Sequence, residues 1–283
     1  MSDRVVVVGA GRMGLAIGGA LLDTGTLDSL TYLGRAADPP AGLRGEYRTL
    51  PAVIPADTTI LLLAVPDSAL PDVAKTIAED GAAPDSCVAL HLAGAVGVAV
   101  LAPLDQVGYA TGSLHPLQTM AAGGDGDLLR DGVAFAIDGD PAAAAAARRI
   151  VTALRGIPLT IEPALRPLYH AAAVMVSNYT IALLRVGARL LAESGVSEND
   201  AVDALLPLLR GTVRNVAELG PAGAMTGPIA RGDADTVRLH LAHLSGRDRM
   251  LYCGLGLEML ELARAAGLAP ERARRIELLL TNG

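Results

Sequence analysis

The sequence predicts an α/β protein in which an N-terminal doubly wound parallel sheet is followed by an all-α C-terminal domain built around one long helix. Three observations predict this organisation. Short apolar segments alternate with helical patterns up to Ile161, a glycine-rich turn follows the first of these segments, and only helical patterns follow Glu162 and Pro163. We therefore expect two domains, 1-161 and 162-283, each long enough to bury a core.

The first apolar segment, Val5 to Val8, leads directly into a turn with the spacing G-x-G-x-x-G, and an amphipathic helix over Met13 to Leu22 follows it. Four β-branched residues are typical of a buried parallel strand. In such a turn the glycines allow a tight bend, a close approach to pyrophosphate and close packing of the helix, whose N-terminus favours the anion. The context predicts a Rossmann dinucleotide-binding site, the alternative being a glycine-rich turn without a ligand. Its expected cofactor-binding residues are Gly9, Ala10, Gly11, Arg12, Met13 and Gly14.

Arg35 follows the second expected strand, where an NAD-binding chain usually carries Asp or Glu for the ribose 2′-hydroxyl. A guanidinium in this position suits a 2′-phosphate. We therefore expect NADPH rather than NADH as the cofactor. A solvated loop arginine is the alternative.

The rest of the first domain alternates between strand and helix patterns. The loop from Ala64 to Ser68 leaves the carboxyl end of a strand, which is the edge where open α/β sheets bind ligands, so we add Ala64, Val65 and Pro66 to the cofactor-binding residues. Strands are expected near Tyr47 to Leu50 and over Thr58 to Val65, Cys87 to Leu92, Tyr109 to Leu114, Val133 to Ile137 and Leu159 to Ile161; helices are expected over Ala69 to Asp80 and Pro141 to Leu154.

One helix of roughly 40 Å is expected over Pro167 to Glu193, at 1.5 Å per residue. It is apolar nearly all round, so we expect it to be buried in the middle of the helical domain or in a dimer interface. Further helices are expected over Ser197 to Leu209, Thr212 to Leu219, Asp233 to Leu244, Asp248 to Ala266 and Pro270 to Leu280.

The composition excludes several classes of protein. A net charge of −7 argues against nucleic acid or an anionic membrane as partner. The start of the chain leaves no room for a signal peptide, and the nearly apolar run from Cys87 to Pro103 is too short to span a bilayer. The two cysteines, Cys87 and Cys253, match no metal or redox spacing, and the five histidines are scattered, so we expect no metal and a cytoplasmic protein with reduced thiols.

His170 is the first candidate for catalysis. It lies near the start of the long helix, and Ser177 and Asn178 follow on nearly the same face. Polar side chains on an apolar helix are costly to bury without a partner or a purpose, and an imidazole titrates near neutrality, which suits a proton donor. The alternative is a core histidine bonded to a backbone carbonyl.

Other polar residues are weaker candidates. His115 leaves a strand at the ligand-binding edge and could touch substrate or nicotinamide, although a structural role in the loop is equally consistent; His91 has a weaker case of the same kind. Thr226 and Arg231 could bind a substrate carboxylate, but Arg231 could equally pair with a neighbouring acid. The remaining histidines, His240 and His243, are expected to be structural or exposed.

Four segments together resemble a known family, the Rossmann-like proteins with a DUF2520 C-terminal domain. They are Val5 to Gly14, Gly112 to Gln118, Tyr169 to Asn178 and Thr226 to Asp233. The resemblance covers nearly the whole chain and implies an oxidoreductase acting on CH–OH groups with the two-domain architecture of 6-phosphogluconate dehydrogenase. Some members are similar to alternative ketopantoate reductases of pantothenate biosynthesis. The architecture also resembles pyrroline-5-carboxylate reductase, and such enzymes are commonly dimers.

The classical ketopantoate reductases carry Lys-x-x-x-Asn-x-x-x-Asn on the long helix, with the lysine as acid. If Asn178 matches the second Asn, His170 stands in place of the lysine and Val174 in place of the first Asn. The chain's one lysine is Lys75, in the first domain. The lysine mechanism therefore does not transfer, and His170 as the acid is a hypothesis specific to this sequence.

These observations lead to one expected function and two alternatives. We expect an NADPH-dependent reductase of a small 2-keto acid such as ketopantoate, acting as a homodimer through the helical domain, with His170 as proton donor and Asn178, Thr226 and His115 orienting the substrate. The first alternative is an imine reductase of the pyrroline-5-carboxylate reductase type. The second is a non-catalytic NADP(H)-binding sensor or regulatory protein.

Overall fold

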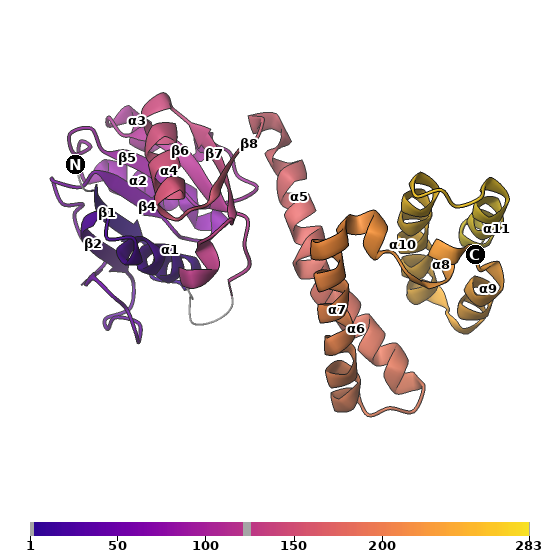
Figure 1. The fold of residues 1–283 in the computed structure, drawn as a ribbon. Coiled ribbons are helices and arrows are strands. Elements are labelled where there is room, and N and C mark those ends of the chain that lie inside the picture. Colours follow the sequence, from indigo (N-terminus) through magenta and orange to yellow (C-terminus); the bar gives the residue numbers. More distant parts are fainter. Residues whose placement is uncertain (1–2, 121–125, 283) are drawn as a thin grey trace. The chain divides into compact units, whose positions relative to one another are not determined.

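The computed structural model describes residues 3–120 and 126–282. Their contacts divide the chain into two compact units, of which unit 1 ends at Asn178 and unit 2 begins at Tyr179. Unit 1 holds a sheet with helices on both faces, and unit 2 is helical (Figure 1). The division falls after the expected domain boundary at 161/162, because the first turns of the long helical stretch pack with the sheet.

The sheet of unit 1 has eight strands in the order β3-β2-β1-β4-β5-β6-β7-β8. The order reverses direction between β1 and β4, the topological switch point at which a doubly wound sheet binds its ligand. The strands are β1 (Asp3–Val8), β2 (Leu27–Gly34), β3 (Glu46–Thr49), β4 (Ile60–Leu63), β5 (Val88–His91), β6 (Ala110–Pro116), β7 (Ala134–Gly139) and β8 (Ile157–Thr160).

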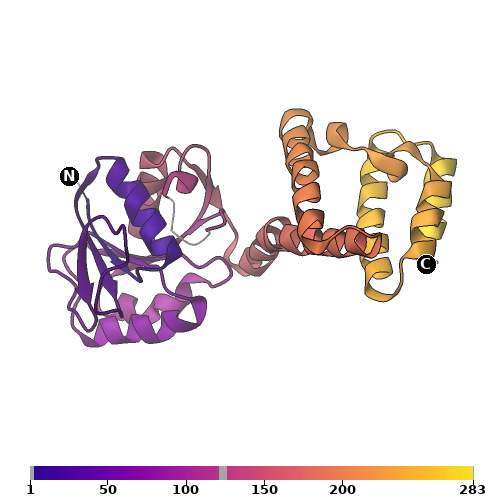
Figure 2. The ribbon, with the colours of Figure 1, turned by 90° about the horizontal axis from the view of Figure 1, so that it is seen from below.

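Two apolar layers cover the sheet because side chains alternate along each strand. Val5 and Val7 of β1 face the layer formed by α1, η3 and α4, whereas Val6 and Val8 face the layer formed by α2, η2 and α3. Figure 2 shows α1 and α2 on opposite sides of the sheet. The helices are α1 (Arg12–Asp23), η1 (Asp67–Ala69), α2 (Leu70–Glu79), η2 (Val98–Leu101), α3 (Ala102–Gln106), η3 (Gly126–Leu129) and α4 (Pro141–Ala153).

The sheet is parallel from β3 to β6, as expected, but β7 runs antiparallel to β6. A parallel neighbour needs a crossover connection of a dozen or more residues, usually a helix. The described part of the connection from β6 to β7 contains the short helix η3, which packs against α1 instead of crossing the sheet. The expectation of an all-parallel sheet is therefore wrong at this one pairing.

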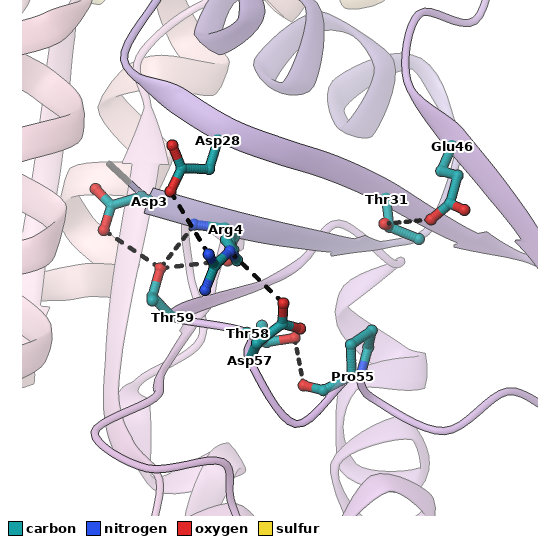
Figure 3. A network of polar contacts seen from close by, with 9 residues as sticks. All are labelled: Asp3, Arg4, Asp28, Thr31, Glu46, Pro55, Asp57, Thr58 and Thr59. Atoms are coloured by element: carbon teal, nitrogen blue, oxygen red, sulfur yellow. Dashed lines mark hydrogen bonds and ion pairs between the residues drawn. The ribbon is translucent and has the colours of Figure 1, made fainter. Parts of the chain in front are cut away.

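A polar network ties together the edge of the sheet where the strands begin (Figure 3). The Thr59 hydroxyl accepts from the Arg4 backbone N–H at 2.9 Å, and the Arg4 guanidinium lies 3.6 Å from Asp57 and 3.9 Å from Asp28. These partners are exposed, so the ion pairs contribute little individually. The network fixes the strand ends on the side of the sheet away from the carboxyl edge.

The long helical stretch is broken at Ser177, which corrects the expectation of one helix. After η4 (Pro163–Leu165), it consists of α5 (Arg166–Val176) in unit 1 and α6 (Asn178–Glu193). The Ser177 hydroxyl bonds to the Ala173 carbonyl at 2.9 Å. A serine bonded back to the previous turn in this way competes with the helical hydrogen bonds and bends the helix.

Unit 2 joins α6 to a small helical core. The helix α7 (Glu198–Ala224) continues through Gly211 and changes direction at Gly220, so the two helices expected between 197 and 219 are one. Its N-cap is Ser197, as expected. The core consists of apolar residues from four helices, α8 (Gly227–Arg231), α9 (Ala234–His243), α10 (Gly246–Ala265) and α11 (Pro270–Thr281).

The helices α6 and α7 expose large apolar side chains, so burial within the chain, one of the two expectations, is wrong. The stretch Pro163–Glu193 is long and apolar enough to cross a membrane by length and composition alone, and only 6% of its most apolar window is buried. The exposed members on these two helices are Tyr179, Ile181, Leu183, Val202, Leu208, Val213, Val216 and Leu219.

Candidate functional site

The glycine turn between β1 and α1 has no room for larger residues at two of its three glycines. A Cβ on Gly9 would lie 2.5 Å from the Ala64 carbonyl oxygen, and its φ of +107° is one that L side chains rarely adopt. A Cβ on Gly14 would lie 1.9 Å from the Gly9 carbonyl oxygen. Both glycines are therefore required by the packing of α1 and of the Ala64 loop against the turn.

Gly11 is different, because a Cβ there would meet no atom within 4 Å. This open side lies at the N-cap of α1, whose first turn carries no acidic residue. Free N–H groups, the positive end of the helix dipole and open space beside a glycine are what a pyrophosphate requires. The turn from Gly9 to Gly14, including Ala10, Arg12 and Met13, therefore fits a dinucleotide at the switch point of the sheet.

The other expected cofactor residues lie at the same edge of the sheet. The Ala64 backbone N–H donates to the Val8 carbonyl at 2.8 Å, which places the loop of Ala64, Val65 and Pro66 beside the glycine turn. Arg35 directly follows β2, is exposed, and forms no ion pair with any residue that the structure describes. Its guanidinium is available to an anion.

A second group of polar residues lies where α5 begins, anchored by Arg166. This arginine is 1% exposed, and it donates to the Ser113 hydroxyl on β6 at 2.9 Å and to the Ala93 carbonyl after β5 at 3.0 Å. Asp138 on β7 lies 3.9 Å away. One buried guanidinium thus ties the first turn of α5 to two strands and to the loop after a third.

The anchored turn of α5 brings two histidines and a tyrosine together. The Tyr169 hydroxyl lies 2.7 Å from Nδ1 of His115, and the rings of His115 and His170 are 5.8 Å apart, edge to face. A Cβ on Gly94 would lie 2.3 Å from Nδ1 of His170 and 2.8 Å from Nε2 of His115. The two expected candidates His115 and His170 are therefore neighbours, and Gly94 leaves the room for their rings.

The surroundings hold His115 in its neutral form. Its pKa is lowered to about 4, chiefly by burial and also by the nearby His170 and Arg166. Burial raises the pKa of Tyr169, while the positive charge of Arg166 opposes that rise. At neutral pH the cluster therefore contains an uncharged His115 and a protonated Tyr169 beside a buried cation.

His91 belongs to the same neighbourhood but is completely buried. Its Nδ1 accepts from the Ala93 N–H at 3.2 Å, and burial lowers its pKa to about 4, with Arg166 acting in the same direction. Since its side chain is 0% exposed, it cannot touch a substrate.

The other expected residues are Asn178 and several residues of unit 2. Asn178 is exposed at the start of α6, beyond the break, and accepts from the Ser177 hydroxyl at 2.9 Å. Thr226 is the N-cap of α8 in unit 2 and makes no side-chain capping bond. His240 and His243 are exposed on α9, as expected. Asp233, close to Arg231 in the chain, caps α9 by accepting a hydrogen bond from the Thr236 N–H. The hydrogen bonds from Thr236 are the main cause of the lowered pKa of Asp233, and the positive charge of Arg231 adds to them.

Sequence reasoning missed three residues of the cluster: Arg166, Tyr169 and Gly94. A signal was present for Tyr169, which directly precedes His170 at the start of a helix. Ser113 and His115 are two residues apart on a strand and so share one face. Arg166 gave no such signal, because an arginine in a sequence is far more often exposed than buried.

Two family models match the chain. Residues 2–116 match the Rossmann-like domain, and residues 133–259 match a domain of unknown function, DUF2520. The chain therefore carries a Rossmann-like domain followed by a DUF2520 domain, as the sequence resemblance implied. No curated protein matches it.

Several solved structures share this fold. Protein TM1727 from Thermotoga maritima has a TM-score of 0.70 at 20% identity, covering 92% of this chain and 98% of that one. Protein BF3122 from Bacteroides fragilis, a proposed NADP oxidoreductase, has 0.68 at 24% identity, covering 94% and 98%. Plasmodium falciparum pyrroline carboxylate reductase with NADP bound has 0.58 at 12% identity, covering 98% of each chain. At such identities the likeness shows the fold alone.

Proposed function

We propose that the protein is an NADPH-dependent oxidoreductase that reduces a small 2-keto acid by hydride transfer. The observation that supports this most directly is the position of the cluster of Tyr169, His115 and His170. It lies by the carboxyl ends of β5 and β6, on the ligand-binding side of the sheet whose switch point carries the glycine turn. A cofactor turn and a proton-donating group on one sheet edge are what a reductase needs.

The cofactor would be held by the chain's own turn and loop residues. Backbone N–H groups at Gly11 and Arg12 would bind the pyrophosphate, and Arg35 would select the 2′-phosphate of NADPH. The loop of Ala64, Val65 and Pro66 would line the cofactor on the side opposite the glycine turn. When bound, NADPH would supply the hydride. The likeness to NADP-bound pyrroline carboxylate reductase supports this choice of cofactor at the level of fold.

His170 is the proposed proton donor. Its ring is half-buried at the start of α5, and its Nδ1 faces inward toward His115. Donation to the oxygen of the reduced carbonyl would then come from Nε2. His115, Asn178 and Thr226 are proposed to orient the substrate. A cyclic imine is the second candidate substrate class, because the fold is shared with pyrroline carboxylate reductase.

We further propose that the apolar surface of α6 and α7 is a homodimer interface. Eight large apolar side chains are exposed along these two helices of unit 2. Exposed large apolar side chains in such number on a folded chain favour an interaction site, and the same surface on a second copy can pair with it about a two-fold axis. Light scattering at micromolar concentration should give twice the chain mass, whereas a monomer that binds neutral lipid vesicles would favour a membrane instead.

The experiment that tests the proposed function is a titration followed by turnover. NADPH fluorescence titration of the pure protein should show saturable binding, tighter than that of NADH. Addition of ketopantoate, other 2-keto acids or cyclic imines should then cause NADPH oxidation at 340 nm. Binding without oxidation of any of these compounds would favour a sensor, and lack of binding would remove the proposal.

The matched variant is His170→Asn. It should lower turnover by about 10²-fold or more and leave the NADPH affinity within about twofold, because general acid catalysis contributes about that much. His243→Asn, a substitution at an exposed histidine of unit 2, is the control and should leave both unchanged. Unchanged turnover in His170→Asn would remove the proposed role of this residue.

A further inference from the structure

Three side chains of the cluster lie in a row. Tyr169 contacts Nδ1 of His115, and the other ring nitrogen of His115, Nε2, approaches the same point beside Gly94 as Nδ1 of His170. Nδ1 of His170 is buried and has no hydrogen-bond partner among the described residues. No hydrogen bond joins the two rings directly. The gap is one that a small ring movement or a single water can bridge.

One arrangement of protons gives each inward-facing nitrogen a partner. If the Tyr169 hydroxyl donates to Nδ1 of His115, that histidine carries its proton on Nε2. Nε2–H can then donate toward Nδ1 of His170, which leaves the proton of His170 on its outward Nε2. All three groups stay neutral, and their donors point in one direction, from the tyrosine to the outer nitrogen.

We propose that Tyr169 and His115 form a proton relay that refills His170 while it protonates the reduced substrate. The inference rests on the proposed reduction. After hydride addition, the alkoxide oxygen takes the proton from Nε2 of His170, and Nδ1 of His170 takes the proton from Nε2 of His115. Nδ1 of His115 takes the Tyr169 hydroxyl proton, so one proton leaves Tyr169 and one reaches the substrate. After the product leaves, Nε2 of His170 takes a proton from solvent and the protons return along the same three groups to the tyrosinate, which restores the starting arrangement.

The charges around the relay favour this direction. Burial raises the pKa of Tyr169, and the positive charge of Arg166, buried within the same turn of α5, offsets part of that rise and so part of the cost of a transient negative charge on Tyr169. The groups that face His115 are Arg166, Tyr169 and His170 on α5, with His91 on β5; the carboxylate of Asp138 on β7 lies against Arg166. Since both Arg166 and His170 disfavour a positive charge on His115, the histidine passes a proton on instead of keeping one.

The protein contains a matched control for the first contact of the relay. In unit 2 the Tyr252 hydroxyl lies 2.9 Å from Nδ1 of His240, with the rings 5.7 Å apart. This pair lies on the exposed side of α9 and α10. Tyr252→Phe therefore removes a tyrosine hydroxyl from an equivalent histidine contact without touching the cluster.

The first test measures the proton positions by long-range ¹H–¹⁵N correlation spectra of the full chain without substrate. In the wild type, His115 should carry its proton on Nε2. Tyr169→Phe should shift His115 toward the other tautomer, and Tyr252→Phe should leave its signals unchanged. A wild-type His115 protonated on Nδ1, or a tautomer that Tyr169→Phe does not alter, would overturn the relay.

The second test compares turnover across pH, using the 2-keto acid or imine that the wild type reduces. The wild type should keep its rate up to about pH 9, because the three groups together supply the proton. Tyr169→Phe should lose roughly tenfold or more there and much less near pH 6, where protons from solvent are more abundant. Equal rates for the two proteins at the higher pH would overturn the relay and leave the proposed reduction intact. If the wild type reduces none of these compounds, the proposed function fails. The spectra alone then test whether Tyr169, His115 and His170 carry their protons as proposed.

Discussion

The described part of the chain contains two histidine–tyrosine pairs of nearly the same geometry in very different surroundings. In both, a tyrosine hydroxyl meets Nδ1 of a histidine, and the rings stand nearly perpendicular, at 89° for His115 and Tyr169 and 88° for His240 and Tyr252. The first pair lies against the sheet beside a buried arginine and a second histidine. The second pair lies on the surface of two helices.

The comparison shows that the contact itself does not create a candidate active site. Burial and the positive charge of Arg166 lower the pKa of His115, and the adjacent His170 gives its second nitrogen a destination. His240 is exposed and has neither neighbour. We therefore expect chemistry at the pair of His115 and Tyr169, whose surroundings disfavour protonation of the histidine. Each variant below changes one part of these surroundings.

The largest effect is expected from Arg166→Met. The substitution leaves the Ser113 hydroxyl, the Ala93 carbonyl and the Asp138 carboxylate without their buried partner, which should cost about 2–4 kcal/mol of unfolding free energy. Urea denaturation followed by circular dichroism measures the loss. The pKa of His115 should also rise, because one cause of its lowering is removed.

Arg238→Met is the control for this substitution. Arg238 pairs with Asp235 on an exposed helix surface, so its removal should cost less than about 0.5 kcal/mol. Equal losses of unfolding free energy in the two variants would mean that Arg166 does not anchor α5. The difference between the two histidine–tyrosine pairs would then need another cause.

Gly94→Ala should have the second largest effect. The added methyl group would lie 2.3 Å from Nδ1 of His170 and 2.8 Å from Nε2 of His115, so at least one ring must move. Overpacking of this kind costs about 1–3 kcal/mol, and the displaced ring should lower NADPH oxidation. Gly97→Ala, where a Cβ meets nothing within 4 Å, should change neither quantity.

The smallest effect is expected from pH. The folded pKa of His115 is about 4, below its ordinary value of 6.5, so between these values the unfolded chain binds more protons than the folded one. Stability is therefore complete above pH 6.5 and is lost as the pH falls toward 4, by about 1–2 kcal/mol at pH 5 for this group. His115→Asn should reduce the change in urea midpoint between pH 7 and pH 5, leaving the part due to His91, whose pKa is also lowered to about 4, whereas His240→Asn should leave the change as it is. An unaltered slope in His115→Asn would contradict the environment assigned to His115.

Most of the fold was predictable because its signals are local. The apolar strand before Gly9, the glycine spacing and the alternation of strands with helices are local patterns, and they predicted a doubly wound sheet without giving the order of its strands. The direction of β7 was not predictable, because strand pairing depends on the path of the connection between 117 and 133. The break at Ser177 was also missed, since nothing in the apolar pattern of the stretch interrupts it.

The candidate site was predictable only in part. His170 and His115 were identified separately, each from its place at the end of an element, but their contact is made across 55 residues of chain. Gly94 became meaningful only when the two rings were seen beside it. Arg166 depends on three partners, two in strands and one in the loop after β5, a relation that no local pattern contains.

The break at Ser177 has a mechanical consequence. Tyr169, His170 and Arg166 all lie on the sheet side of it, within a segment bonded to the strands, and α6 begins on the other side. The hydrogen bonds of these groups are all made before the break. They therefore do not depend on the direction that the chain takes after Ser177, and the proton-handling groups form one unit with the strands that hold them.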